Sequence, residues 1–358
     1  MRKILKTLIP VAAALGALSA GMTFSHADEL EKVRLVSGNP VMVVSTPELY
    51  VPLAMGWWRD EGFDVEVLYA QGSSAGAQLM VGGSGEVGMI NTIPIVVADS
   101  KGAADIRAVS VITNTVWQIV TLKDGGVTNA ADLKGKTVGL AVPGPGGAMY
   151  LNALLKKVGV NPGEVRQVVS GVGLQSLEAL RKGSIDAFLT YRPDIVQLEV
   201  LGVEFNALYD EAWLRFPDYG LVATKQAIDE NPDMVEAIAR GVSKANIFMN
   251  ENPACVARIY GKDYAAQAGQ RSAEQDTRII AGQLADRDIP FAQTGGQLRG
   301  VVDPAGMDEL QDFLVANGVI EKKLDTQNLI IDRPGFYERV NDFSVEEVKK
   351  QARECPGY

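Results

Sequence analysis

The sequence predicts an α/β protein made of two similar lobes, and two observations carry this prediction. Strand-like and helix-like segments alternate up to about residue 223. One pattern also occurs twice, at 65–94 and at 165–193: a strand, a glycine-rich turn, a helix, a glycine, a short apolar strand and a proline. The copies are not identical in length, so they share a plan rather than a strict repeat. Two such lobes imply a cleft between them, and small ligands bind in such clefts.

The first lobe opens with two apolar runs, at 33–36 and 41–44. A short helix starts near Leu49 and ends at Gly62, where glycine serves as the C-cap. The remaining elements expected in this lobe are strands at 65–68, 106–112 and 116–122 and a helix at 95–98.

The second lobe is expected to begin near Gly125 with a helical turn at 129–135 and a strand at 136–141. A loop at 143–147 leads into a helix at 148–158, whose apolar residues recur at the helical period. This alternation of strands and helices predicts parallel sheets with helices on their faces.

A strand at 216–223 is expected to return the chain to the first lobe. Helices then pack against that lobe, at 233–250, 254–260, 273–285, 304–317 and 345–353. The expected organisation is a signal peptide at 1–27, a first lobe at 28–122, a second lobe at 123–217, and a return to the first lobe with the C-terminal helices at 218–358.

The N-terminal segment has the three parts of a secretory signal peptide. Basic residues come first, an apolar stretch at 8–20 follows, and Ser25-His26-Ala27 forms a small-x-small cleavage site. The apolar stretch is too short to span a bilayer. We expect cleavage after Ala27 and a periplasmic protein without a lipid or membrane anchor; the alternative is an uncleaved N-terminal anchor.

Charge and histidine content exclude several function classes. The formal net charge is −10, and removal of three basic residues with the signal peptide makes it −13. A chain this acidic is a poor partner for nucleic acid or an anionic membrane. The single histidine, His26, would leave with the signal peptide. No imidazole then remains for a catalytic triad or a histidine-ligated metal, and we expect no enzyme activity, no metal and no cofactor.

The two cysteines, Cys255 and Cys355, suggest one disulfide in an oxidising compartment. This bond would tie the C-terminus to a helix about 100 residues earlier and contribute up to about 4–5 kcal/mol. The alternative is two separate thiols.

Candidate ligand-binding residues lie where strands lead into helices, because ligands of open α/β sheets bind beyond the carboxyl ends of the strands. The residues selected on this ground, with flat side chains that could form walls for an organic ligand, are Ser45, Thr46, Tyr50, Gly72, Ser73, Ser74, Asn91, Thr92, Trp117, Gly146, Gly147, Ala148, Thr190, Tyr191, Arg192, Asp218 and Tyr219. Core packing is the alternative for Trp117.

Two of the candidate loops and one residue allow more specific predictions. Gly72-Ser73-Ser74 would point backbone amides and hydroxyls at an anion, or would be an ordinary turn with a serine N-cap. The loop 143–147 lacks both the P-loop lysine and a dinucleotide fingerprint, so it does not indicate nucleotide binding. Arg192 could bind a carboxylate or sulfonate with two hydrogen bonds, or form a salt bridge at the lobe surface.

The chain resembles the substrate-binding proteins of nitrate/taurine/sulfonate ABC importers, which share their domain with the enzymes that make the pyrimidine of thiamine. The resemblance extends to about residue 253 and rests on Tyr50–Ala54, Glu61–Glu66, Gly85–Gly88, Ala131–Gly139, Gly183–Ala187 and Asn231-Pro232. It implies a type II periplasmic binding protein fold with a two-strand hinge and a ligand cleft. It also implies docking on a permease with its ATPase.

Tyr191-Arg192-Pro193 stands where the family often has Trp-x-Pro, and the cysteine-rich motif and histidine of the pyrimidine-making enzymes are absent. The preferred hypothesis is therefore a monomeric periplasmic protein that binds an organic anion, a sulfonate or carboxylate with or without an aromatic ring. The alternatives are a binder of a pyrimidine or other vitamin precursor, an enzyme on the same fold, and a sensor input module.

Overall fold

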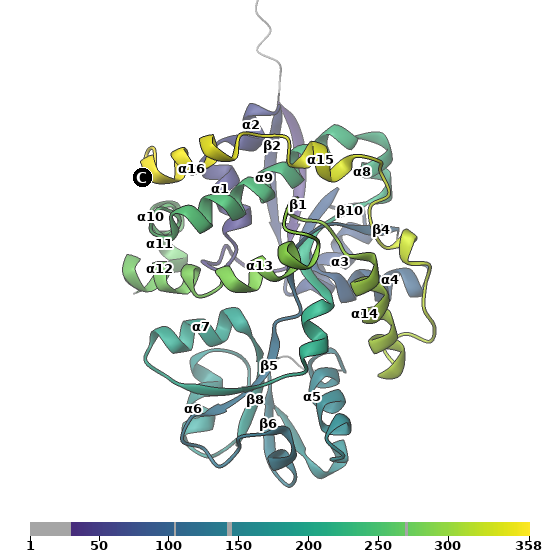
Figure 1. Cartoon of the computed structure of the whole chain (residues 1–358), viewed down its shortest axis with the longest axis vertical. Helices are drawn as coiled ribbons and strands as arrows, with labels where there is room; N and C mark the ends of the chain where they lie inside the picture. The colour runs from purple at the N-terminus through teal and green to yellow at the C-terminus, as the bar shows by residue number, and fades with distance from the viewer. Residues whose placement is uncertain (1–29, 104, 142–144, 269–270) are drawn as a thin grey trace, which may run out of the picture.

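Each lobe is built on a five-stranded mixed sheet (Figure 1). The computed structural model describes residues 30–103, 105–141, 145–268 and 271–358, so the expected signal peptide with His26 lies outside the described residues. The first sheet has the order β2 (Phe63–Tyr69), β1 (Glu31–Ser37), β3 (Val87–Asn91), β10 (Pro217–Thr224), β4 (Ile106–Asn114). The second has the order β7 (Arg166–Val169), β6 (Thr137–Leu140), β8 (Ala187–Tyr191), β5 (Trp117–Leu122), β9 (Phe205–Leu208).

The two sheets have equivalent strand orders and directions. In each, the first three strands are parallel, and the fourth is antiparallel to both of its neighbours. In each sheet this fourth strand directly follows a passage of the chain from the other sheet. It is β10 in the first sheet and β5 in the second. The predicted α/β class is confirmed, with mixed sheets rather than purely parallel ones.

The doubled sequence pattern forms equivalent units in the two lobes. The first unit joins β2 to β3 through α3 (Ser73–Val81), and the second joins β7 to β8 through α6 (Leu174–Arg181). Gly72 and Gly173, the N-caps of these helices, have φ angles of 97° and 63°, which favour glycine. Both units end in a helix, α4 (Thr92–Ser100) and α7 (Arg192–Val200).

The carboxylates that precede β3 and β8 also have equivalent roles. Glu86 Oε2 accepts a hydrogen bond from Arg34 N at 2.9 Å, and Asp186 Oδ2 accepts one from Thr137 N at 2.8 Å. Each therefore ties the turn before its own strand to the neighbouring strand, β1 or β6.

The chain crosses between the sheets twice, after β4 and before β10. The crossing segments are hydrogen-bonded to each other, from Thr115 N to Phe216 O at 2.8 Å. The strand at Trp117–Leu122 was expected in the first lobe, but as β5 it pairs with β8 and β9 of the second sheet. The outward crossing is therefore at 115–116, between the end of β4 and the start of β5.

Helices of the C-terminal part cover the first sheet, as expected. They pack with α1 (Pro47–Ala54) and α2 (Trp57–Asp60) in one apolar core. Those in this core are α9 (Pro232–Glu251), α10 (Pro253–Asp263), α12 (Ala273–Ala281), α15 (Phe336–Val340) and α16 (Val345–Glu354). The others are α8 (Lys225–Glu230), α11 (Ala265–Ala268), α13 (Leu284–Gln293) and α14 (Pro304–Ala316), and α5 (Pro145–Lys157) covers the second sheet.

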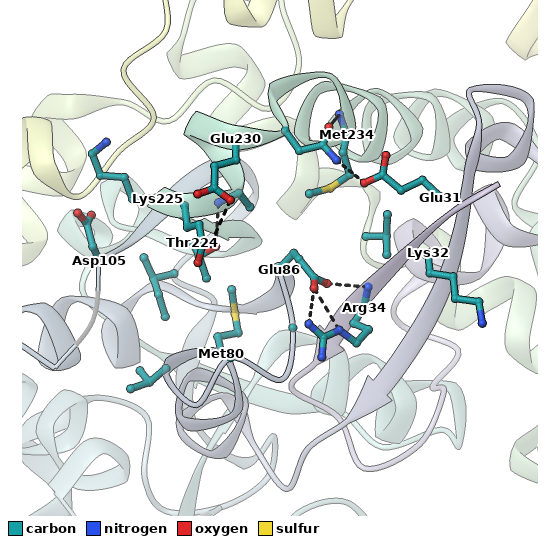
Figure 2. Close-up of a pocket in the computed structure, with 18 of the residues that line it drawn as sticks. Glu31, Lys32, Arg34, Met80, Glu86, Asp105, Thr224, Lys225, Glu230 and Met234 are labelled. Atoms are coloured by element: carbon teal, nitrogen blue, oxygen red, sulfur yellow. Dashed lines mark hydrogen bonds and ion pairs between the residues drawn. The ribbon is translucent and has the colours of Figure 1, made fainter. Parts of the chain in front are cut away.

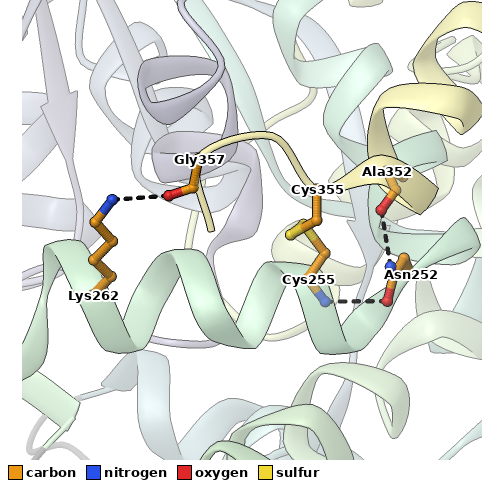
Figure 3. The surroundings of a disulfide bond; sticks show 6 residues. All are labelled: Asn252, Cys255, Lys262, Ala352, Cys355 and Gly357. Atoms are coloured by element: carbon orange, nitrogen blue, oxygen red, sulfur yellow. Dashed lines mark hydrogen bonds between the residues drawn. A yellow bond between two sulfur atoms is a disulfide. The ribbon is translucent and has the colours of Figure 1, made fainter.

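A disulfide joins Cys255 of α10 to Cys355 at the end of α16, as expected (Figure 3). Two hydrogen bonds flank it: Asn252 Nδ2 donates to Ala352 O at 2.8 Å, and Lys262 Nζ donates to Gly357 O at 2.9 Å. The C-terminus is thereby fixed along α10.

Two predicted helices have different bounds in the structure. The helix expected at 273–285 is two helices, α12 and α13, because the chain breaks at Gly282-Gln283 and resumes through Pro290 to Gln293. The helix expected from residue 148 starts at Pro145, a residue type that suits a first helical turn. None of the helices within the described ranges is long and apolar enough to span a membrane.

Candidate functional site

Four of the predicted residues form a hydrogen-bonded group at the strand ends of the first lobe, which we call the polar cluster: Ser73, Asn91, Thr92 and Asp218. Ser73 Oγ donates to Asn91 Oδ1 at 2.6 Å and accepts from Asn91 N at 3.0 Å. Asn91 Nδ2 donates to Asp218 Oδ1 at 2.7 Å, and Thr92 Oγ1 donates to Asp218 O at 2.8 Å. The strand order places β3 beside β10, which brings Asn91 and Asp218 together.

A glycine that sequence reasoning did not select allows this arrangement. A Cβ at Gly38, just after β1, would lie 2.9 Å from Ser73 Oγ. Only glycine therefore lets the loop after β1 approach the helix start that carries Ser73.

Asp218 is the electrostatically unusual member of the polar cluster. Its side chain is almost completely buried, at 3% exposure. Burial raises the pKa of its carboxyl to about 6, and the hydrogen bond from Asn91 offsets only part of that increase. The carboxylate is therefore charged at neutral pH and would be stabilised by further hydrogen-bond donors.

Three aromatic side chains, Trp117, Tyr150 and Tyr191, form what we call the aromatic group. Trp117 of β5 lies opposite Tyr191 of β8, with ring centroids 5.6 Å apart in an edge-to-face arrangement. Tyr150 of α5 stacks on Trp117 at 6.0 Å, and its hydroxyl lies 3.2 Å from Thr115 Oγ1 at the crossing. Trp117 and Tyr191 are half-buried, whereas Tyr150 is buried.

The aromatic group and the polar cluster are close in space. Burial is the main cause of the raised pKa of Tyr150, and the charge of Asp218 contributes to it. Tyr150 was not predicted, because a tyrosine on the apolar face of a helix looks like a core residue. In the structure it links residues from the two lobes.

Arg192 has a carboxylate partner on its own helix. Its Nη1 donates to Glu199 Oε1 at 3.0 Å, and its backbone N donates to Val116 O at 2.9 Å. Burial raises the pKa of the Asp286 carboxyl on α13, and the charge of Arg192 offsets part of that increase. The anion-binding role of Arg192 stays a prediction.

The hydroxyls of several other predicted residues are engaged within their own lobes. Thr46 Oγ1 donates to Val43 O at 3.0 Å, and Thr190 Oγ1 donates to Asp194 Oδ2 at 2.7 Å. Tyr50 is completely buried, and its hydroxyl donates to Val44 O at 3.1 Å. The expectation that Tyr50 forms a ligand wall is therefore not met in this structure, because its ring packs on Tyr260 and Tyr264 of the core.

The remaining predicted residues lie at helix starts or beside β3. Gly72 and Ser74 are exposed at the start of α3, and Gly146, Gly147 and Ala148 are in the first turn of α5. Residues 142–144 lie outside the described residues. Tyr219 pairs with Asn91 in the sheet, and its buried hydroxyl has no hydrogen-bond partner among the described residues.

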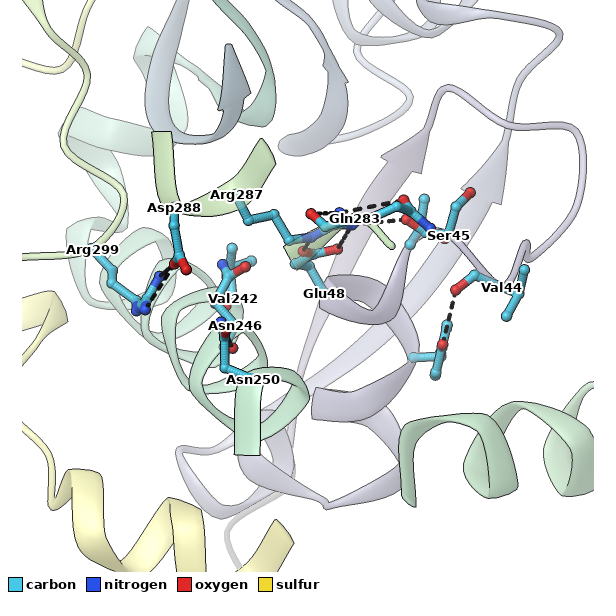
Figure 4. A network of polar contacts seen from close by, with 12 residues as sticks. Val44, Ser45, Glu48, Val242, Asn246, Asn250, Gln283, Arg287, Asp288 and Arg299 are labelled. Atoms are coloured by element: carbon cyan, nitrogen blue, oxygen red, sulfur yellow. Dashed lines mark hydrogen bonds and ion pairs between the residues drawn. The ribbon is translucent and has the colours of Figure 1, made fainter. Parts of the chain in front are cut away.

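A buried ion pair next to the predicted Ser45 was missed by sequence reasoning (Figure 4). Arg287 Nε of α13 donates to Glu48 Oε1 of α1 at 2.6 Å, and Arg287 Nη2 donates to Ser45 O at 2.9 Å. Arg287 Nη1 also lies 3.3 Å from Gln283 Oε1. Both charged side chains are nearly inaccessible, so the pair needs these hydrogen bonds to offset its desolvation.

A pocket of about 600 Å³ lies at the opposite end of the first sheet (Figure 2). It is lined by the starts of β1 and β4 and the end of β10. Its polar side chains are largely paired with one another, Arg34 with Glu86 and Asn231 with Glu31. Within the described residues, no group of acidic, histidine or cysteine side chains is arranged to hold a metal ion.

Comparison with known proteins identifies the family. The sequence profile described as NMT1/THI5 like matches residues 45–255, which is more than half of the chain. The chain belongs to the NMT1/THI5-like family. The NMT1/THI5-like region contains the whole polar cluster and the whole aromatic group, whereas α13 with Arg287 lies beyond it.

Two curated proteins are similar to this NMT1/THI5-like chain. The formylaminopyrimidine-binding protein of Halalkalibacterium halodurans is 23% identical over 283 residues, which cover 76% of this chain and 82% of that protein. The 4-amino-5-hydroxymethyl-2-methylpyrimidine phosphate synthase of Schizosaccharomyces pombe is 22% identical over 218 residues, 57% of this chain and 62% of that one.

A solved structure confirms the predicted fold. The periplasmic aliphatic sulphonate binding protein SsuA from Escherichia coli superposes with a TM-score of 0.63 at 16% identity, covering 84% of this chain and 92% of that one. The NMT1/THI5-like chain therefore has the periplasmic binding protein fold, as the sequence resemblance implied.

Proposed function

We propose that this protein is a periplasmic solute-binding protein that holds a small nitrogen heterocycle of the aminopyrimidine type between its lobes. The observation that carries the proposal is the buried Asp218 carboxylate, which has a pKa raised to about 6 and, within the described residues, a side-chain hydrogen bond from Asn91 rather than an ion pair. A ligand that donates N–H groups to this carboxylate would stabilise its charged form. An anionic group at the same place would be repelled by it.

The aromatic group supplies the second half of the recognition. Trp117 and Tyr191 of the second lobe are half-buried and meet edge to face, so one ring can stack on a flat ligand while the other closes its edge. A planar ring with exocyclic amino groups matches both this surface and the polar cluster. The similar protein of Halalkalibacterium halodurans is a formylaminopyrimidine-binding protein, which agrees with this ligand class.

The second candidate ligand is an organic anion, a sulfonate or carboxylate bound by Arg192. The fold shared with a sulphonate-binding protein favours it. Arg192 would have to exchange Glu199 for the ligand, and Glu199 is 38% exposed, so it could be hydrated after the exchange. Asp286 and Glu199 make the surroundings of Arg192 acidic, which is why we prefer the heterocycle.

The proposed biological role is delivery of the bound solute to an ABC permease and its ATPase in the inner membrane. The same proposal includes three further points. The segment at 1–27 directs export, the protein is monomeric, and it binds the solute without converting it. Because the chain is similar to a pyrimidine phosphate synthase, we test whether the protein converts its bound ligand. Recovery of the ligand unchanged after long incubation is the expected result, and any product would contradict a purely binding function.

A thermal-shift panel with the mature chain tests the ligand class. The panel contains 4-amino-5-hydroxymethyl-2-methylpyrimidine, a formylaminopyrimidine, taurine, an aliphatic sulfonate, benzoate and nitrate. A ligand at 100 times its Kd stabilises the protein by about 2.7 kcal/mol, a measurable shift. We expect the pyrimidines to raise the Tm. Shifts from anions alone, lost in Arg192→Ala, would contradict the proposal and establish the second candidate.

A further inference from the structure

Helix α7 of the second lobe lies against α12, one of the C-terminal helices of the first lobe (Figure 1). The contact is close at Gly282, between α12 and α13, where an added Cβ would lie 2.6 Å from Val196 Cγ1 of α7. This contact is separate from the crossings at 115–116 and 209–216. It therefore constrains how the lobes can move relative to each other.

The charges at this contact are unevenly paired. Arg192, at the start of α7, pairs with Glu199 at 3.0 Å, and the side chains are 27% and 38% exposed. Asp286, at the start of α13 in the other lobe, has a buried Oδ2 without a hydrogen-bond partner among the described residues. A buried carboxylate oxygen without a donor is costly.

Arg192 is the cation suited to relieve that cost. Arg287 follows Asp286 directly, but its guanidinium already donates to Glu48, to Ser45 O and to Gln283. Arg192 has a partly exposed partner and lies near enough for its charge to lower the pKa of Asp286. The exchange of one carboxylate partner for another would require the long side chain of Arg192 to rotate away from Glu199.

We propose that Arg192 is a latch between the lobes: when the lobes close on a ligand, its guanidinium leaves Glu199 and pairs with Asp286, four residues after the Gly282 contact with α7. The latch rests on the proposed function in one respect, that ligand binding closes the lobes. It makes Arg192 a positioning residue that stabilises the closed form without touching the ligand. Glu199 is the competing partner that favours the form without ligand.

The proposal predicts effects of opposite sign for two isosteric substitutions. Asp286→Asn removes the partner of the closed form, so we expect the Kd for 4-amino-5-hydroxymethyl-2-methylpyrimidine to rise about three- to tenfold. Glu199→Gln removes the competitor, so we expect that Kd to fall. Arg192→Gln should add nothing to Asp286→Asn, because the two residues act as one unit. Calorimetric titration measures the unmodified chain, the three single variants and the Arg192→Gln/Asp286→Asn double variant.

Asp288→Asn is the matched control. Asp288 lies on the same helix but pairs with Arg299 at 3.3 Å, away from α7. We expect its Kd to match that of the unmodified chain. The latch is wrong if Glu199→Gln and Asp286→Asn change the Kd in the same direction, or if the effects of Arg192→Gln and Asp286→Asn add.

Hydrogen exchange measured in the ligand-free protein tests the latch independently of the proposed function. In the free protein, Glu199→Gln should slow hydrogen exchange of the first-turn amides of α13, and the added substitution Asp286→Asn should abolish that slowing. If the pyrimidine does not bind but this protection appears, the proposed function fails and the latch stands. Binding of the pyrimidine with equal exchange in all variants would leave the function intact and overturn the latch.

Discussion

Replacement of Asp218 by asparagine should stabilise the protein at neutral pH, although the residue lies in the proposed site. The carboxyl of an unfolded chain titrates at an ordinary pKa of about 3.9. In the folded protein burial raises the pKa to about 6. Between these values the folded state binds more protons, so the free energy of unfolding falls as the pH rises. The difference corresponds to about 2–3 kcal/mol of destabilisation at pH 7.

Asp218→Asn removes this cost and can keep the local contacts. Its side-chain carbonyl can accept the hydrogen bond that Asn91 Nδ2 now donates over 2.7 Å, and the bond from Thr92 goes to a backbone oxygen. We therefore expect the variant to gain about 2 kcal/mol at pH 7. At pH 4.5, which lies between the two pKa values, only part of this cost is present, so the gain should fall to about 1 kcal/mol or less.

Urea unfolding at both pH values, followed by tryptophan fluorescence and far-UV circular dichroism, measures this difference. The two signals should coincide before a free energy is derived, because a two-lobed chain can unfold in steps. A variant that is less stable than the unmodified chain at pH 7 would refute the reasoning. It would mean that the carboxylate is held by donors stronger than Asn91.

The remaining predictions concern the disulfide, the aromatic group and the buried ion pair. Replacing Cys255 and its partner by serine should lower the free energy of unfolding in urea by up to about 4–5 kcal/mol, and a change below about 1 kcal/mol would contradict the chain-entropy argument. Trp117→Ala should raise the calorimetric Kd for 4-amino-5-hydroxymethyl-2-methylpyrimidine about tenfold, whereas Trp117→Phe should keep a Kd close to that of the unmodified chain. Equal Kd values for the two variants would exclude stacking. Glu48→Gln should cost about 3–5 kcal/mol in the same urea assay because it leaves Arg287 buried without a counter-charge, and a neutral result would show that water solvates Arg287.

The polar cluster could be predicted from the sequence because its residues lie at strand ends, and the topology alone determines which strand ends meet. Ser73, Asn91 and Asp218 were selected as residues at strand ends, and the structure joins them by hydrogen bonds. The doubled pattern predicted equivalent lobes, and both turns place a glycine with a positive φ angle, Gly72 or Gly173, at the helix start. Such features follow from chain direction and strand order.

The features that were missed depend on packing between segments distant in sequence. Arg287 and Glu48 are separated by 239 positions, and α13 contains Pro290, a residue that normally argues against a helix. Tyr150 was hidden by the apolar face of its own helix. The pairing of Arg192 with Glu199, seven residues later on one helix face, is the exception, because helical spacing brings positions two turns apart to the same side.

The most direct test of the central claim is the affinity of Asp218→Asn for 4-amino-5-hydroxymethyl-2-methylpyrimidine, measured by calorimetry at pH 7.5. Asp99→Asn is the matched control, since Asp99 also has a pKa raised by burial, to about 7, but lies near Asp105 and Arg107, away from the polar cluster. Loss of a charged hydrogen-bond acceptor costs about 1.5–3 kcal/mol, so we expect Asp218→Asn to raise the Kd about 10- to 100-fold and Asp99→Asn to leave it unchanged. An unchanged Kd in Asp218→Asn would contradict the claim that this carboxylate recognises the ligand.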